Sequence, residues 1–288
     1  LMPGYTHYQR AMPTTAGLWA LGYAELLASD LEGLYAAYEQ VNVSPLGSAA
    51  GYGVPYLGLP REAVAERLGF SGVQTHVTAV QLSRGKLELH VVHALVQVAA
   101  TINRMAADLV QFNSAEFGFV TLPPEFCTGS SIMPQKQNPD VFELARAYYH
   151  RITAEMHLLL SLPANLPSGY HRDLQLTKEA AMRSVLTTRD LLAAMVQGVP
   201  EIQFNTDRMR SALSPDLFAT AHAMEQVRNG VPFRDAYRNA AKELDRLNLP
   251  EASEALSAYM VDGFPGRLRP DLVREQVRNA AGWIETGS

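Results

Sequence analysis

Residues 78–113 read TAVQLSRGKLELHVVHALVQVAATINRMAADLVQFN, and this stretch decides the fold class. It contains no proline, and its aliphatic residues recur at the three- and four-residue spacing of one helical face. They are Leu87, Leu89, Val92, Leu95, Val96, Val98, Ala99, Ile102, Met105 and Leu109. A helix over the whole stretch would extend roughly 50 Å at 1.5 Å per residue. We therefore expect one long helix here, longer than most helices of globular proteins.

Similar apolar stretches before and after it predict further long helices. Thr14 or Thr15 would cap a helix over residues 15–40, and its few charges indicate burial on several sides. A third helix is expected over residues 139–162 and a fourth over residues 173–197. Long apolar helices of this kind are typical of a helical bundle.

The character of the sequence changes near residue 204. The helices expected beyond it are shorter and more charged, and they cover residues 208–213, 215–229, 232–247 and 270–286. No stretch shows a convincing strand or βαβ pattern. We therefore predict an all-α protein, with a central helical bundle domain over residues 1–204 and a smaller C-terminal helical domain over residues 205–288.

Composition excludes several classes of function. The chain has 288 residues, a net charge of −5 and no run of Lys and Arg, which argues against binding nucleic acid. No apolar run is long enough to cross a membrane. The single Cys127 excludes an internal disulfide framework and a cysteine-based metal site, and it fits a cytoplasmic location. His90 and His93 lie three residues apart, but no carboxylate-rich motif accompanies them, so a structural role is favoured over metal binding.

The polar loop GSSIMPQKQNPD, residues 129–140, precedes the third long helix. It combines the Ser130 hydroxyl with the positive charge of Lys136, and Asn138 and Pro139 are expected as helix cap and first helical residue. Free N–H groups and the dipole at a helix start favour an anion there. A well-capped loop with a surface lysine would have the same composition, so both interpretations stay open at this point.

Two further polar segments, residues 4–10 and 169–178, also lie at ends of long apolar helices. A bundle can bring such ends together. His7 beside the carboxylate of Glu143 would then be a candidate general acid or base, and Ser130 beside a cation could be stabilised as an alkoxide. Such a cage suits removal of a proton next to a carboxylate, because it stabilises the charge that develops. A serine hydrolase is the competing enzyme class, but the chain has no Gly-x-Ser-x-Gly motif.

Several segments resemble one known family. GSSIMPQKQN (129–138) and GYTHYQRAMP (4–13) resemble the signature loop and the Thr-His segment of the fumarase/aspartase superfamily. Within it, the argininosuccinate lyases are most similar, over nearly the whole chain. The segments that carry this closer resemblance are QKQNPD (135–140), SAEFGF (114–119), NVSPLGS (42–48), the Tyr170–Lys178 segment and VPFRDA (231–236).

The resemblance implies an all-helical homotetramer whose active sites are shared between subunits, and β-elimination of argininosuccinate to arginine and fumarate without a cofactor or metal. Ser130 would be the base, and His7, paired with Glu143, would assist in protonating the leaving nitrogen. The implied substrate-binding residues are Thr6, Lys136 and Asn138 for the succinyl carboxylates, and Tyr170, Gln175 and Lys178 for the rest of the substrate, including its amino-acid end.

Two departures from the family leave alternatives open. The family carries an N-terminal domain with a further substrate-binding segment, and this chain is expected to start after it. The stretch that contacts the amino-acid end in the family is QLSRGK (81–86) here, where Arg84 would replace the usual arginine from one residue away. The alternatives are a lyase for a modified argininosuccinate, another fumarate-releasing lyase such as adenylosuccinate lyase, and a non-catalytic scaffold like the lens crystallins of this family.

Overall fold

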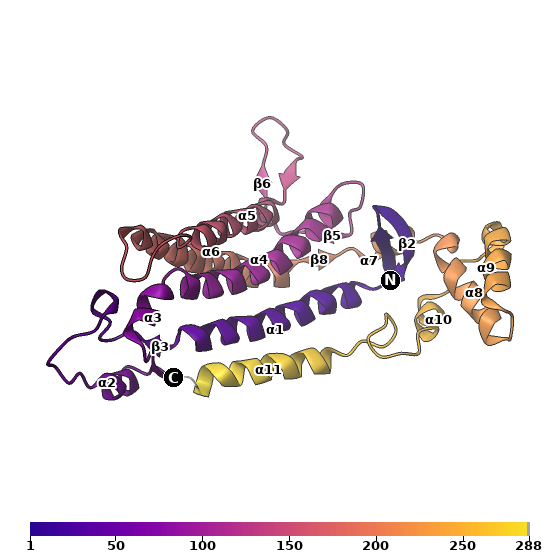
Figure 1. Cartoon of the computed structure of the whole chain (residues 1–288). Coiled ribbons are helices and arrows are strands. Elements are labelled where there is room, and N and C mark those ends of the chain that lie inside the picture. Colours follow the sequence, from indigo (N-terminus) through magenta and orange to yellow (C-terminus); the bar gives the residue numbers. More distant parts are fainter. Residues whose placement is uncertain (287–288) are drawn as a thin grey trace. The chain divides into compact units, whose positions relative to one another are not determined.

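The computed structural model describes residues 1–286, and these are predominantly helical (Figure 1). They form two compact units. Unit 1 contains residues 1–25, 109–123 and 202–275, and unit 2 contains residues 26–108, 124–201 and the described part of 276–288. A change from long apolar helices to short charged ones is expected from the sequence near residue 204, and the chain re-enters unit 1 close by, at residue 202. Separate folding of residues 1–204 and 205–288 stays a prediction.

Unit 2 holds most of the long helices. The first of them, α1, spans Ala16–Val41 and passes from unit 1 into unit 2, and α4 spans Lys86–Asn113 and passes back. Helix α5 spans Asp140–Ser161, and α6 spans Leu176–Gly198 after a short 3-10 turn at Arg172–Gln175. The shorter α2 covers Arg61–Arg67. Three of the four long helices expected from periodicity are thus confirmed close to their expected bounds, and the second is confirmed only from Lys86 onward.

Helices α5 and α6 lie side by side and bury their shared face (Figure 1). Phe142, Ile152 and Leu159 of α5 have no exposed surface. On α6, the Ser184 hydroxyl donates to the carbonyl of Ala180 at 2.8 Å, so this buried polar group is satisfied inside its own helix. This packing fixes the starts of α5 and α6, to which two of the predicted polar segments are attached.

The expectation of one helix over residues 78–113 is wrong. The chain instead forms α3 over Val77–Leu82, turns, and starts α4 at Lys86. Gly85 has a φ of +79°, a left-handed conformation that ends one helix and that other residues adopt only with strain. The Glu88 carboxylate accepts a hydrogen bond from the Gly85 N–H at 2.7 Å, which caps the start of α4.

Replacing Gly85 with Ala is expected to lower the free energy of unfolding by about 1–2 kcal/mol. The left-handed conformation is strained for alanine because its Cβ crowds the backbone carbonyl oxygen. The new Cβ would also lie 3.2 Å from Cγ of Pro163, tighter than an ordinary contact. Urea unfolding measures the change. The control is Gly33→Ala in the middle of α1, where a Cβ meets nothing within 4 Å. Alanine there should leave stability unchanged or raise it by up to about 1 kcal/mol, and equal effects at both positions would contradict the explanation.

The expectation that the chain contains no strands is also wrong in detail. Met2–Thr6 (β1) pairs antiparallel with Gln9–Thr14 (β2) in unit 1, and His7 and Tyr8 form the two-residue turn with φ values of 53° and 58°. The Thr15 hydroxyl then accepts from the Leu18 N–H at 3.0 Å and caps α1, as expected. His7 is therefore held at the tip of a hairpin and not in an irregular segment.

Three other strand pairs have two residues on each side. Val43–Ser44 (β3) pairs parallel with Gly72–Val73 (β4), and the antiparallel pairs are Val120–Thr121 (β5) with Gln203–Phe204 (β8) and Thr128–Gly129 (β6) with Gln137–Asn138 (β7). These short pairs fasten loops to the helical framework and leave the all-α class unchanged.

The C-terminal part of unit 1 is made of short helices. They are α7 (Thr206–Ser211), α8 (Ala219–Arg228), α9 (Phe233–Lys242) and α10 (Ala252–Ser257), and α11 (Pro270–Thr286) begins in this unit. Helices α8 and α9 pack through Ala223, Ala236 and Ala240. The expected helices are confirmed here, although α10 was not expected. In the part of the chain that the structure describes, none of the helices combines the length and hydrophobicity that a bilayer requires.

Candidate active site

The predicted base lies on a hairpin arm that precedes α5. Strands β6 and β7 pair Thr128 with Asn138 and Gly129 with Gln137, and Ser130 opens the loop between them. Figure 1 shows this hairpin as an extension from the start of α5. Residues 131–137 are exposed, whereas Ser130 is half-buried. A short strand pair therefore carries the loop, and few other contacts restrain it.

The Ser130 hydroxyl oxygen already has two hydrogen-bond donors. The backbone N–H groups of Ile132 and Met133 donate to it at 3.3 Å and 3.1 Å. Such a turn places two positive dipole ends at one oxygen. Because these dipoles are fixed before any reaction, they would stabilise negative charge on this oxygen when it loses its proton.

Lys136 and Asn138 form a pair at the end of the same loop. The Lys136 ammonium group donates to the side-chain oxygen of Asn138, and the Asn138 amide donates to the Thr128 hydroxyl at 3.4 Å. The Thr128 hydroxyl donates in turn to the Asp140 carboxylate. This chain of contacts holds a cation and an amide together on the hairpin that carries Ser130, and their binding of a carboxylate stays a prediction.

The expected helix cap at Asn138 is wrong. Asn138 lies in strand β7, Pro139 is the cap of α5, and the Pro139 carbonyl accepts from the N–H of Phe142 at 3.0 Å. The side chain of Asn138 is therefore available for contacts across the hairpin and does not cap the helix. An isolated Asn-Pro pair suggests a cap, but it does not reveal that a strand ends there.

His7 and Thr6 belong to unit 1, whereas the other predicted site residues belong to unit 2. Within its own unit, Glu143 lies in the first turn of α5 and is 3.9 Å from the Arg146 guanidinium. The His7–Glu143 pairing stays a prediction, and so does the contact of Thr6 with the substrate.

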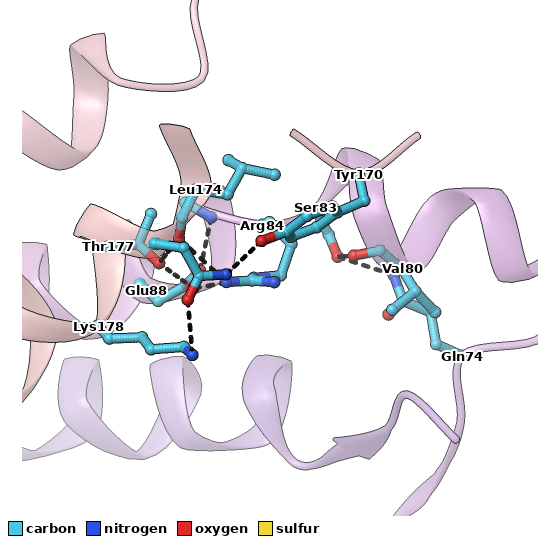
Figure 2. A network of polar contacts seen from close by, with 11 residues as sticks. Gln74, Val80, Ser83, Arg84, Glu88, Tyr170, Leu174, Thr177 and Lys178 are labelled. Atoms are coloured by element: carbon cyan, nitrogen blue, oxygen red, sulfur yellow. Dashed lines mark hydrogen bonds and ion pairs between the residues drawn. The ribbon is translucent and has the colours of Figure 1, made fainter. Parts of the chain in front are cut away.

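The predicted residues of the Tyr170–Lys178 segment do come together (Figure 2). The Gln175 amide donates to the Tyr170 hydroxyl at 2.6 Å, and the Lys178 ammonium group donates to the Gln175 oxygen at 3.0 Å. Arg84, from the turn between α3 and α4, donates to the Leu174 carbonyl at 3.1 Å. The structure thus gathers a phenol, an amide and two cations in one network, a set suited to a ligand with carboxylate and polar groups.

Two residues of this network were missed by sequence reasoning. The Glu88 carboxylate accepts from the Thr177 hydroxyl at 3.0 Å and lies 3.6 Å from the Arg84 guanidinium. The capping signal of Glu88, three residues after Gly85, is visible in the sequence, but its contact with Thr177 spans 89 positions.

Cys127 lies directly before the hairpin. Partial burial raises the pKa of its thiol, and the nearby Asp140 carboxylate raises this pKa further. The neutral thiol is therefore favoured, and we expect slower alkylation by iodoacetamide at neutral pH than for free cysteine, since the thiolate is the nucleophile. The rate measured against pH should climb only at a higher pH than for free cysteine. A rate equal to that of free cysteine would contradict this expectation.

Within residues 1–286, no group of three or more His, Cys, Asp and Glu side chains is placed to hold a metal ion. His93, one of the histidines considered above, has a ring nitrogen 3.3 Å from the Gln97 amide, a contact within helix α4.

Comparison with known proteins places the chain in a family. A family model described as "Lyase" matches residues 1–154. The chain is 46% identical to the argininosuccinate lyase of Sorangium cellulosum over 283 residues, which cover 97% of this chain and 65% of that protein. It is 43% identical to the argininosuccinate lyase of Thermotoga neapolitana over 243 residues, which cover 84% of this chain and 61% of that protein.

Among solved structures, a crystal structure of EDDS lyase in complex with formate superposes with a TM-score of 0.81 and 21% sequence identity. The match covers 99% of this chain and 63% of that chain, and it confirms the helical fold. The chain thus spans less than two thirds of the length of these relatives. Because the family match covers more than half of the residues, the chain belongs to the lyase family of the fumarase/aspartase superfamily.

Proposed function

We propose that the protein cleaves argininosuccinate into arginine and fumarate by β-elimination, as part of arginine biosynthesis in the cytoplasm. One observation carries this proposal. The Ser130 oxygen, held by two backbone N–H groups, lies on the same hairpin as the Lys136–Asn138 pair. A base beside carboxylate-binding groups is what removal of a proton next to a carboxylate needs.

The reaction proceeds as follows. Ser130, as the alkoxide, takes the proton from the succinyl carbon adjacent to the one that bears the nitrogen. The electron pair of the broken C–H bond is stabilised by the neighbouring carboxylate, which Thr6, Lys136 and Asn138 bind. This pair then forms the double bond of fumarate while the C–N bond breaks. His7, paired with Glu143, delivers a proton to the leaving guanidino nitrogen, so that atoms and charge balance without a cofactor.

The remaining predicted residues bind the arginine portion. The Tyr170, Gln175 and Lys178 network and Arg84 offer hydrogen-bond donors for an amino-acid carboxylate. Adenylosuccinate has a nucleotide in place of the arginine portion and lacks the amino-acid end that this set is proposed to bind. These polar contacts therefore favour the guanidino substrate over adenylosuccinate.

The test is formation of fumarate, followed by its ultraviolet absorbance. The chain is assayed alone and after completion with the part of the Sorangium cellulosum relative that it does not match, because it spans 65% of that protein. Argininosuccinate should yield fumarate at least in the completed protein, and adenylosuccinate should not. No fumarate from argininosuccinate in either form would contradict the proposal and favour the scaffold alternative.

We further propose that the protein is a homotetramer. Helix α6 exposes several large apolar side chains in the single chain, among them Met182 at 65% and Val196 at 72% exposure. An apolar helix face of this kind is usually covered by another subunit. Light scattering on the purified protein is expected to give four times the mass of one chain. A monomer at micromolar concentration would contradict both the tetramer and an active site shared between subunits.

A further inference from the structure

Glu88 makes contacts that join two segments far apart in the sequence. One carboxylate oxygen accepts from the Gly85 N–H at 2.7 Å at the start of α4. The other accepts from the Thr177 hydroxyl at 3.0 Å at the start of α6. Arg84, whose guanidinium lies 3.6 Å from this second oxygen, donates to the Leu174 carbonyl at 3.1 Å. The Arg84–Glu88 pair thus holds the turn Leu174–Thr177 at two points (Figure 2).

The two residues held in this way are almost completely inaccessible. Thr177 has 0% and Leu174 has 2% exposed surface. The Leu174 carbonyl is also 3.0 Å from the Thr177 hydroxyl oxygen, so the single hydroxyl proton is shared between Glu88 and Leu174. Breaking these hydrogen bonds is costly for Leu174 and Thr177, because their buried polar groups would find no water.

The residues between and after these anchors are the accessible ones. Gln175 follows Leu174 and Lys178 follows Thr177, and these two side chains are joined to each other at 3.0 Å. The contacts with Arg84 and Glu88 fix the backbone at Leu174 and Thr177. They therefore also fix the direction in which the side chains of Gln175 and Lys178 point. Thr177 is buried, whereas Gln175 is half-buried and Lys178 is exposed.

We propose that Glu88, acting through Thr177, is a positioning residue for the substrate-binding network of Tyr170, Gln175 and Lys178. This proposal rests on the function proposed above, because it assigns the role to that site. Glu88 does not touch the substrate. It sets the position of the side chains that bind the amino-acid end, so its loss should weaken binding more than it slows the chemical step.

A purely structural role for Glu88 would act through the cap at Gly85 alone. The variant Thr177→Val removes the hydroxyl, with its contacts to Glu88 and Leu174, and leaves Glu88 and its contact with Gly85 in place. Thr177→Ser retains the hydroxyl and serves as the conservative rescue. Glu32→Gln, on an exposed position of α1, makes the same change of charge as Glu88→Gln and serves as the control.

The first measurement is hydrogen exchange of the backbone amides at residues 174–178, which needs no activity. Glu88→Gln and Thr177→Val should both speed this exchange, whereas Thr177→Ser and Glu32→Gln should leave it as in the parent chain. Unchanged exchange in Thr177→Val, or faster exchange in Glu88→Gln alone, would overturn the proposal, because Glu88 would then act only on its own helix.

The second measurement is KM and kcat for argininosuccinate, determined in whichever form of the protein produces fumarate in the assay above. Both variants should raise KM for argininosuccinate about tenfold while changing kcat less than about threefold. Faster exchange without a change in KM would overturn the link between the turn and binding. If the parent protein forms no fumarate at all, the proposed function fails, while the exchange result still decides whether Glu88 holds the turn.

Discussion

Replacing Ser130 with Ala is expected to reduce kcat for argininosuccinate by at least about a thousandfold, because a general base contributes factors of this size. Alanine leaves Lys136, Asn138 and the hairpin pairing in place, so substrate binding should change little. The backbone N–H groups of Ile132 and Met133 lose their acceptor, but both lie in an exposed loop where water replaces it. The oligomeric state and the thermal stability should therefore remain those of the parent.

The adjacent Ser131 provides a matched control. It is exposed, whereas Ser130 is half-buried and carries the two N–H contacts. Ser131→Ala should keep kcat within about threefold of the parent, in line with the small effect of most surface substitutions. The measurement is fumarate formation by the completed protein for both variants. A rate unchanged by Ser130→Ala, or equal losses in both variants, would contradict the assignment of Ser130 as the base.

Much of the fold could be predicted because its signals are local. The apolar periodicity of α1, α4, α5 and α6 depends on spacings of three and four residues, and all four helices form. The break before α4 was missed because it depends on the left-handed conformation of Gly85, and an isolated glycine in an apolar run does not reveal its backbone angles. The β1–β2 hairpin was missed because its strands are short and contain Pro3 and Pro13.

The candidate site shows the same difference between contacts of neighbouring residues and contacts of residues far apart in the sequence. The Lys136–Asn138 contact and the Tyr170–Gln175–Lys178 network connect residues at most five positions apart, and the motifs that contain them predicted both groups. The Glu88–Thr177 and Arg84–Leu174 contacts connect residues about ninety positions apart. Such contacts follow from how helices pack, and no local pattern encodes them. Residues that position a site are therefore harder to find from sequence than the residues they position.

Replacing His7 with Asn is expected to lower kcat by about a hundredfold to ten-thousandfold, the range of an acid catalyst. The choice of asparagine follows from the hairpin. His7 has a φ of 53°, and asparagine adopts this left-handed region more readily than alanine does. The turn should therefore persist while the proposed proton donor to the leaving nitrogen is lost. Tyr8→Asn makes the same change at the neighbouring turn position, which has a φ of 58°, and should leave the rate within about threefold.

The His7 and Ser130 variants should also fail at different steps. With Ser130 intact, His7→Asn should still exchange the succinyl C–H proton of argininosuccinate with deuterium from heavy water, although it releases little fumarate. Ser130→Ala should do neither. The pairing of His7 with Glu143 is tested by the double variant with Glu143→Gln. If the two residues act as one unit, the double variant loses no more activity than His7→Asn alone. Losses that multiply would show that His7 and Glu143 act independently, and a different residue would then have to orient the acid.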